Sequence, residues 1–144
     1  MKRLHIHIAV DDLPRSIEFY STLFAARPTI EKADYAKWLL DDPRVNLAIS
    51  ARHAPAGLDH LGIQVESDDE LREIASRLKD AGKIVQDQDA ATCCYARSNK
   101  SWVSDPSAIR WETFFSFDTA TSYGEDNAPV LKPGAACCSA DSCC

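Results

Sequence analysis

Apolar and polar residues alternate in two segments of the chain, "LHIHIAV" at residues 4–10 and "HLGIQV" at residues 60–65. This period of two predicts two strands, each with one apolar face, and in both strands the opposite face carries histidine. The apolar faces are suited to packing beneath a helix. The histidine faces are expected to form the wall of a cavity.

An amphipathic helix is predicted after each of these strands. In the first helix, residues 13–24, apolar side chains recur at helical spacing, and Asp12 is placed to cap the N-terminus. The second helix is expected at residues 69–81. Gly82 stands where a left-handed C-terminal cap is expected. The two halves of the chain therefore begin in the same way, with a strand followed by a helix.

Further strand-like segments give each half the layout βαβββ. They are "YAKWLL" and "VNLAIS" in the first half, and "KIVQ", "TCCYA", "SWVSD" and "IRWETFFSF" in the second. We expect one α+β domain, residues 1–117, whose two modules at about 4–50 and 59–117 form a curved mixed β-sheet around a cavity. Residues 51–59 are the expected linker. Residues 118–144 are polar, small and rich in turn formers, and are expected to form a flexible tail.

Charge and hydropathy exclude several classes of partner. The formal net charge of -6 argues against a nucleic-acid-binding protein, which needs clustered Lys and Arg. No apolar run approaches the roughly 20 residues that span a bilayer, and the N-terminus lacks the continuous apolar stretch of a signal peptide. We therefore expect no membrane partner and a cytoplasmic location.

The six cysteines form three adjacent pairs: Cys93-Cys94, Cys137-Cys138 and Cys143-Cys144. Neighbouring Cα atoms lie about 3.8 Å apart, closer than in ordinary disulfides, so a bridge within a pair would be strained. In a reducing cytosol we expect paired thiols. Such pairs suit soft, thiophilic metals and metalloids.

The repeated modules, each opening on a histidine with a valine five residues later, and the closing "DPSAIRWETFF" resemble the vicinal oxygen chelate superfamily. That group includes glyoxalases, extradiol dioxygenases and bleomycin-resistance proteins. The segments "TCCYA" and "KSWVSDP" are similar to those of the carbon–arsenic lyases and their cadmium-induced relatives. One departure from the superfamily pattern is Ala108, which replaces the usual glycine.

The resemblance implies a metal site formed by His5, His60 and Glu112. Two imidazoles and one carboxylate would form a facial triad that leaves positions open on Fe(II). His7 lies on the same strand face as His5, but in the repeat it corresponds to Gly62, so we assign it to the cavity wall. "VNLAIS" supplies no fourth carboxylate of the glyoxalase I type.

The resemblance also implies that Cys93 and Cys94 bind a trivalent organoarsenical beside the iron, and that molecular oxygen takes part in cleaving its carbon–arsenic bond. Beyond the metal ligands, no further catalytic residue is assigned. In a regular strand the two thiols would point to opposite faces, so chelation requires a bend or a loop. Free cysteine is also a common small core residue. Arg97 and Lys100, close in sequence, could favour the thiolate form of these cysteines, but we expect both on a solvated face.

Several alternatives remain open from the sequence. The thiols could sequester cadmium or arsenite without catalysis, or the chain could be a generic glyoxalase-like metalloenzyme. The tail cysteines, Cys137, Cys138, Cys143 and Cys144, could capture metalloids and deliver them to the cavity, or form only an oxidation-prone end. The superfamily often pairs two chains, which implies a homodimer as one arrangement.

Overall fold

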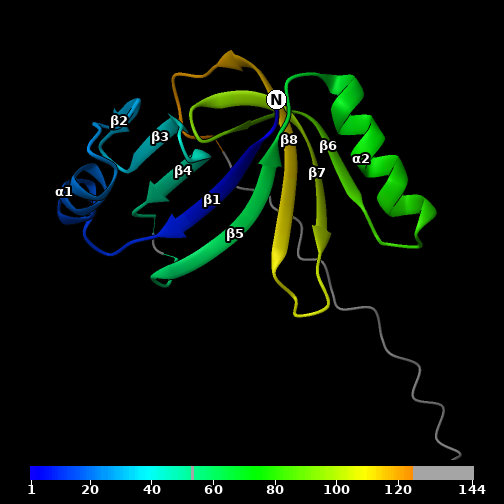
Figure 1. Cartoon of the computed structure of the whole chain (residues 1–144), viewed down its shortest axis with the longest axis horizontal. Coiled ribbons are helices and arrows are strands. Elements are labelled where there is room, and N and C mark those ends of the chain that lie inside the picture. The colour runs from blue at the N-terminus through cyan, green and yellow to red at the C-terminus, as the bar shows by residue number, and fades with distance from the viewer. Residues whose placement is uncertain (53, 125–144) are drawn as a thin grey trace, which may run out of the picture.

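The computed structural model describes residues 1–52 and 54–124, which fold into one curved sheet with two helices outside it (Figure 1). The first module contains β1 (Arg3–Ala9), α1 (Leu13–Phe24), β2 (Ile30–Lys32), β3 (Tyr35–Asp41) and β4 (Arg44–Ser50). The second contains β5 (Gly57–Gln64), α2 (Asp68–Asp80), β6 (Gln86–Cys93), β7 (Ala96–Ser104) and β8 (Arg110–Thr119). The expected α+β fold of two βαβββ modules is confirmed.

The eight strands form a single mixed sheet in the order β2-β3-β4-β1-β5-β8-β7-β6. The modules meet where β1 and β5 pair antiparallel, with His5 opposite Gly62 and His7 opposite His60. Each of these strands also pairs in parallel with the last strand of its own module, β1 with β4 and β5 with β8. The arrangement has an approximate twofold relationship, and it places both histidine-bearing strands at the centre of the curve.

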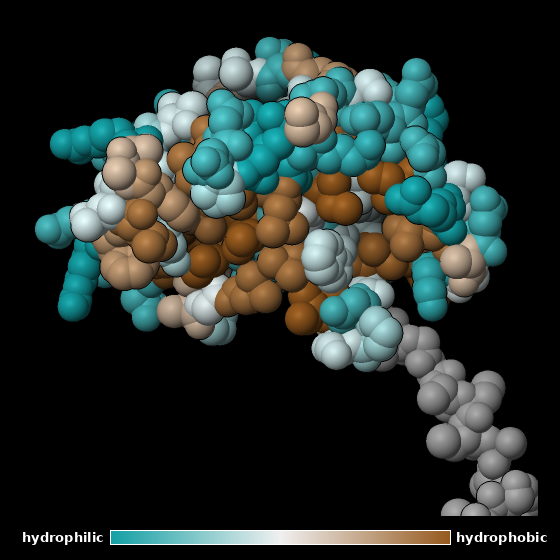
Figure 2. All heavy atoms as spheres, viewed as in Figure 1, coloured by the Kyte–Doolittle hydropathy of each residue, from teal (hydrophilic) through white to brown (hydrophobic). Residues whose placement is uncertain are grey.

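The helices pack on the two flanks of the outer face, where they bury apolar side chains, whereas Leu4 and Leu58 on the central strands stay exposed. Beneath α1, the buried core contains Leu13, Ala36, Trp38, Leu47 and Ile49. Beneath α2 it contains Val65, Leu71 and Ile74. Figure 2 shows apolar side chains gathered on the outer face between the two helices. Neither helix in the described part of the chain is long and apolar enough to cross a membrane.

Caps define the helices largely as expected. The Asp12 side chain accepts a hydrogen bond from the backbone N–H of Arg15, and Ser67 accepts one from that of Glu70. Gly82 follows α2 with φ +71°, in the left-handed region. Ala108 also has a positive φ of 64°, which is a conformation that favours the glycine of the superfamily pattern.

Strand boundaries in the second module differ from the sequence expectation. Only the last residue of "KIVQ", Gln86, belongs to β6, and "TCCYA" is the end of β6, a tight turn and the start of β7. The folded part also extends past residue 117, because β8 ends at Thr119 and the buried Tyr123 packs on the sheet. Polar and small residues after Phe117 hid this extension in the sequence.

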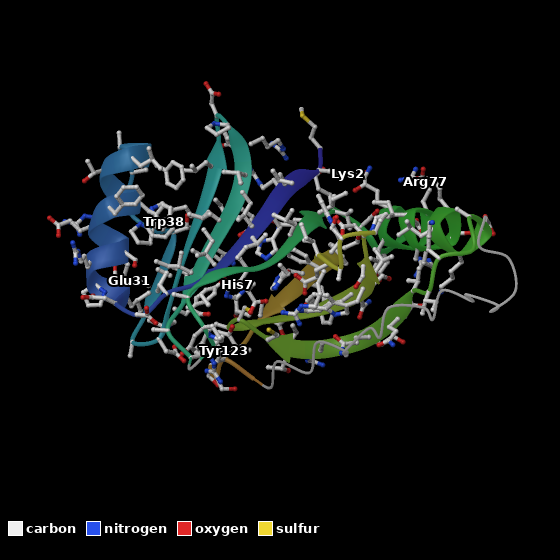
Figure 3. All side chains as sticks on the ribbon, turned by 90° about the horizontal axis from the view of Figure 1, so that it is seen from below. Lys2, His7, Glu31, Trp38, Arg77 and Tyr123 are labelled. Carbon is white, nitrogen blue, oxygen red and sulfur yellow. The ribbon has the colours of Figure 1, made fainter. Side chains whose placement is uncertain are left out.

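The two edges of the curved sheet approach each other near the end of β6. The Tyr95 hydroxyl, just after β6, donates a 2.6 Å hydrogen bond to Asp34, just before β3. The rings of Tyr35, Tyr95 and Tyr123 lie 5.8 to 5.9 Å apart, and the Arg52 guanidinium lies 3.7 Å from the centre of the Tyr123 ring. These contacts close the curve around its inner face. Figure 3 shows His7 on that inner side and Trp38 turned towards α1.

Candidate metal centre and thiol pocket

Three donor atoms converge on the inner face of the sheet, from residues that are far apart in the sequence but lie on the neighbouring strands β1, β5 and β8. Nε2 of His5 lies 3.3 Å from Nε2 of His60, and Oε2 of Glu112 lies 3.5 Å from the His60 nitrogen and 3.8 Å from the His5 nitrogen. All three side chains are buried. The separations fit a single ion bonded to each atom at about 2.1 Å. Two imidazoles and a carboxylate suit a divalent transition metal ion.

Hydrogen bonds behind the imidazoles orient them towards this point. Nδ1 of His5 donates to the backbone carbonyl of Asn46 at 3.0 Å, and Nδ1 of His60 donates to the Asp59 carboxylate at 2.6 Å. Asp59 is held in turn by Arg110 at 2.6 Å. With Nδ1 protonated in this way, each ring can present the lone pair of Nε2 to a metal. The donor set therefore fits a resident metal ion.

Lys100 completes the surroundings of Glu112. Its Nζ lies 2.5 Å from Oε1 of Glu112, and both side chains are buried. The expectation of a solvated Lys100 is therefore wrong, because β7 pairs beside β8 and turns this side chain inwards. Burial opposes ionisation of Glu112, but Lys100 and then His60 outweigh it and hold the pKa of Glu112 well below its usual range. A carboxylate in this state can bind a metal without losing a proton.

The two histidines have opposite pKa shifts in the metal-free site. Burial lowers the pKa of His5 to about 4. Burial also disfavours charge on His60, but hydrogen bonds to Asp59 and Glu112 prevail and raise its pKa to about 9. At neutral pH, His5 is thus neutral and His60 is charged.

Gly62 permits the close approach of His5 and Glu112. It is paired with His5 on one side and with Glu112 on the other. A Cβ at this position would overlap the backbone carbonyl of Glu112 and would lie 3.3 Å from the His5 ring. Glycine is therefore required here for space.

The repeat also locates the position of a fourth ligand. His7 is the counterpart of Gly62, and His7 pairs with Ala48 as Gly62 pairs with Glu112. Ala48 thus occupies the place of a second carboxylate, in accord with the three-ligand set expected from "VNLAIS". His7 itself is fully buried, with Nε2 2.9 Å from the Ser50 hydroxyl. One ring nitrogen from each of His5, His7 and His60 lies within 4.8 Å of the other two.

Cys93 and Cys94 lie at the tip of the hairpin formed by β6 and β7. Cys93 pairs with Ala96, and the two residues between them, Cys94 and Tyr95, both have positive φ, at 58° and 60°. This is the backbone of a type I′ turn, which ordinarily contains Asn or Gly. The turn breaks the strand alternation and brings the two sulfurs to 3.0 Å. At that separation one thiophilic atom can bond to both.

The surroundings of Cys94 favour the ionised form of its thiol. A hydrogen bond from Cys93 is the main cause that lowers the pKa of Cys94 well below its usual value, against the effect of burial. His7 and Lys100 add to this lowering. The Cys94 thiol also lies 3.5 Å from the Tyr123 hydroxyl. A thiolate is the form that reacts with soft electrophiles.

One pocket, here called the thiol pocket, joins the thiols to the metal centre. Its lining includes Cys93, Cys94, His5, Tyr35, Lys37, Asn46, Lys100 and Glu112. The free space in this partly open pocket is about 30 Å³, room for about one or two water molecules. A larger ligand must displace part of this lining.

The structure thus brings together His5, His60, Glu112, Cys93 and Cys94. The tail pairs, Cys137-Cys138 and Cys143-Cys144, lie outside the described residues. Sequence reasoning considered an effect of Lys100 on the thiols but missed its pairing with Glu112. It also missed Lys37, and it placed Asp59 in the linker. Alternation from Trp102 could have indicated the inward face for Lys100, whereas Asp59 carries no signal apart from its position next to His60.

Comparisons with known proteins identify the family of this chain. Residues 2–113 match the family model of the Glyoxalase/Bleomycin resistance protein/Dioxygenase superfamily. A trivalent organoarsenical cleaving enzyme from Bacillus sp. is 43% identical over 83% of this chain and 76% of its own. The cadmium-induced protein CadI of Mycobacterium tuberculosis is 34% identical over 86% of this chain and 82% of its own.

Among solved structures, homoprotocatechuate 2,3-dioxygenase from Arthrobacter globiformis superposes with a TM-score of 0.61 at 19% identity. The match covers 84% of this chain and 38% of the dioxygenase chain, so it concerns the fold alone. The family match, the relatives and the shared fold lead to one conclusion: the chain belongs to the Glyoxalase/Bleomycin resistance protein/Dioxygenase superfamily.

Proposed function

We propose that this protein is an enzyme that cleaves the carbon–arsenic bond of trivalent organoarsenicals, with a metal ion bound by His5, His60 and Glu112. The observation that carries the proposal is the thiol pocket. Its lining contains the two sulfurs, 3.0 Å apart, together with His5 and Glu112. The name of the relative at 43% identity, a trivalent organoarsenical cleaving enzyme, supports the same reaction.

The thiols bind and orient the substrate. Trivalent arsenic is thiophilic, so Cys93 and Cys94 form two As–S bonds and displace its two hydroxyl ligands. The hydroxyls leave as two water molecules, one with the thiol proton of Cys93 and one with a proton from solvent. The bound arsenic then lies in a pocket whose far wall contains Glu112 and His5, which fixes the carbon substituent near the metal centre. Such positioning supplies part of the rate enhancement by removing the entropy cost of encounter.

The remaining residues prepare the metal centre. Asp59 and the Asn46 carbonyl hold the two imidazoles in orientation, and Lys100 keeps Glu112 ionised. Fe(II) bound there would supply oxygen-dependent redox chemistry at a coordination position left open by the three ligands. The proposal requires reduced thiols, which fits the cytoplasmic location expected from the sequence.

The proposal is tested with protein reconstituted anaerobically with Fe(II) and then supplied with methylarsenite in an oxygen electrode. Substrate-dependent oxygen uptake with release of arsenite is the expected result. Cys93→Ala and Cys94→Ala should retain the iron and lose this uptake. The double variant Cys137→Ala, Cys138→Ala removes another adjacent thiol pair and should turn over normally at saturating substrate. Full activity of the Cys93 and Cys94 variants would refute the arsenical assignment.

Sequestration of cadmium or arsenite is the second candidate function. It is favoured by the close pair of sulfurs and by the CadI relative, which is named a cadmium-induced protein. A sequestering protein would bind these species stoichiometrically and would consume no oxygen in the same assay. A glyoxalase I-type isomerase is disfavoured by Ala48 at the place of the fourth ligand.

A further inference from the structure

Lys37 is a cation on the inner face of the sheet. It shares that face with Tyr35, because the intervening Ala36 and the following Trp38 pack in the core beneath α1. Its side chain is half-buried and lines the thiol pocket together with Cys94. Lys37 thus lies beside the place where the arsenical would bind.

Among the described residues, no carboxylate lies within 4.0 Å of the Lys37 ammonium. The other cation of the pocket, Lys100, is paired with Glu112 at 2.5 Å. Lysine side chains that lose water ordinarily gain a partner of opposite charge. Burial accordingly lowers the pKa of Lys37, with Cys94 as the one opposing influence.

The repeat explains why this lysine lacks a partner. Lys37 pairs with Ala48 across β3 and β4, whereas its counterpart Trp102 pairs with Glu112 across β7 and β8. In the first module the cross-strand neighbour of Lys37 is the small Ala48. In the second module the residue that corresponds to Ala48 is the carboxylate Glu112. The pocket also contains an unmet acceptor, because the buried Oδ1 of Asn46 has no hydrogen-bond partner among the described residues.

We propose that Lys37 forms an anion-recognising end of the thiol pocket and selects trivalent arsenicals whose carbon substituent carries a carboxylate. The inference rests on the proposed function, since the arsenic must first be bound by Cys93 and Cys94. Once arsenic is bonded to both sulfurs, the negative charge of Cys94 is lost, and a carboxylate on the substituent then supplies a counter-charge to Lys37. A charge-assisted hydrogen bond in a partly buried site is worth roughly 1.5–3 kcal/mol, which corresponds to a preference of about tenfold or more.

The test compares the binding of phenylarsine oxide and of 4-carboxyphenylarsine oxide to the metal-free full chain by calorimetry. The two compounds share the arsenic and the ring, so their affinity ratio isolates the carboxylate. The wild-type protein should bind the carboxylated compound about tenfold more tightly. Lys37→Met should bring the ratio near one with little loss for phenylarsine oxide, and Lys37→Arg should retain the preference.

Lys32→Met is the matched control, because it removes a cation of the same module that lies outside the pocket lining, and it should leave the ratio unchanged. Melting curves of each variant verify folding. An equal loss of affinity for both compounds in Lys37→Met would mean that Lys37 acts only on the thiolates, and would overturn the inference. A wild-type ratio near one would overturn it as well. Failure of the wild-type protein to bind either compound would instead refute the arsenical function itself, and the inference with it.

Discussion

The ammonium of Lys100 lies 2.5 Å from Oε1 of Glu112, and this contact leaves Oε2 facing the Nε2 atoms of His5 and His60. A single carboxylate is thereby shared between a lysine and the proposed metal. The pair is buried, so water cannot solvate the charge that remains when its partner is removed. Lys100 therefore keeps Glu112 charged and orients it towards the metal, although Lys100 is not itself a metal ligand.

Lys100→Met should destabilise the metal-free protein by about 3–5 kcal/mol, because it leaves a buried carboxylate without its main counter-charge. A bound divalent ion restores positive charge next to Glu112, so the loss should be smaller in the metal-loaded protein. Urea unfolding with and without Zn(II) measures both values. An equal loss of unfolding free energy in the two states would show that a bound metal does not compensate for the missing charge of Lys100.

Metal affinity should rise with pH between about 6 and 9. A metal binds only neutral imidazole, and His60, whose pKa is raised to about 9, must release a proton below that pH. His5, whose pKa is lowered to about 4, is already neutral and releases none. The affinity for Zn(II), measured by competition with a chelator, should therefore increase about tenfold per pH unit until pH 9.

Asp59→Asn provides the control for this pH dependence. The change removes one of the two groups that raise the pKa of His60, so the plateau of affinity should be reached at a lower pH. A pH dependence identical to that of the wild-type protein would mean that His60 is not the group that exchanges its proton for the metal.

Gly62→Ala should weaken metal binding and lower stability by about 1–3 kcal/mol, since the new methyl group overlaps the Glu112 backbone and crowds His5. Gly82→Ala is the matched control. That glycine has a positive φ but open space around it, so its replacement should cost stability without affecting the metal. Zn(II) titration and thermal melting of both variants separate the two effects. Unchanged Zn(II) affinity in Gly62→Ala would contradict the tight spacing inferred for the centre.

Much of the fold was predictable from local signals in the chain. The alternation in β1 and β5 gave the faces of the central strands, and the spacing of apolar residues with the Asp12 cap gave α1 to its observed limits. The irregular parts were less predictable. "TCCYA" has the composition of a strand, and nothing in Cys94 or Tyr95 favours a left-handed turn, so tertiary contacts such as the Tyr95–Asp34 hydrogen bond determine its conformation.

The residues of the candidate site could be predicted from the residues alone only where they follow the repeat. The repeat equates His5 with His60 and separates His5 from His7, and the superfamily resemblance supplied Glu112. The partners of these ligands depend on strand order instead. Lys100 is buried because β7 lies beside β8, and Asp59, which accepts a hydrogen bond from His60, is held by Arg110 on the neighbouring strand β8. Such pairings between strands leave no spacing pattern along the chain.

The most direct measurement is the visible absorption spectrum of Co(II) bound to the full chain, recorded while phenylarsine oxide is added. If His5, His60 and Glu112 bind the metal beside the thiols, one Co(II) should bind per chain and its spectrum should change as one arsenical binds. The change should be absent in Cys93→Ala and Cys94→Ala, and His60→Ala and Glu112→Ala should bind no Co(II). An unperturbed cobalt spectrum in the arsenical complex, or full Co(II) binding by the His60 and Glu112 variants, would contradict the account.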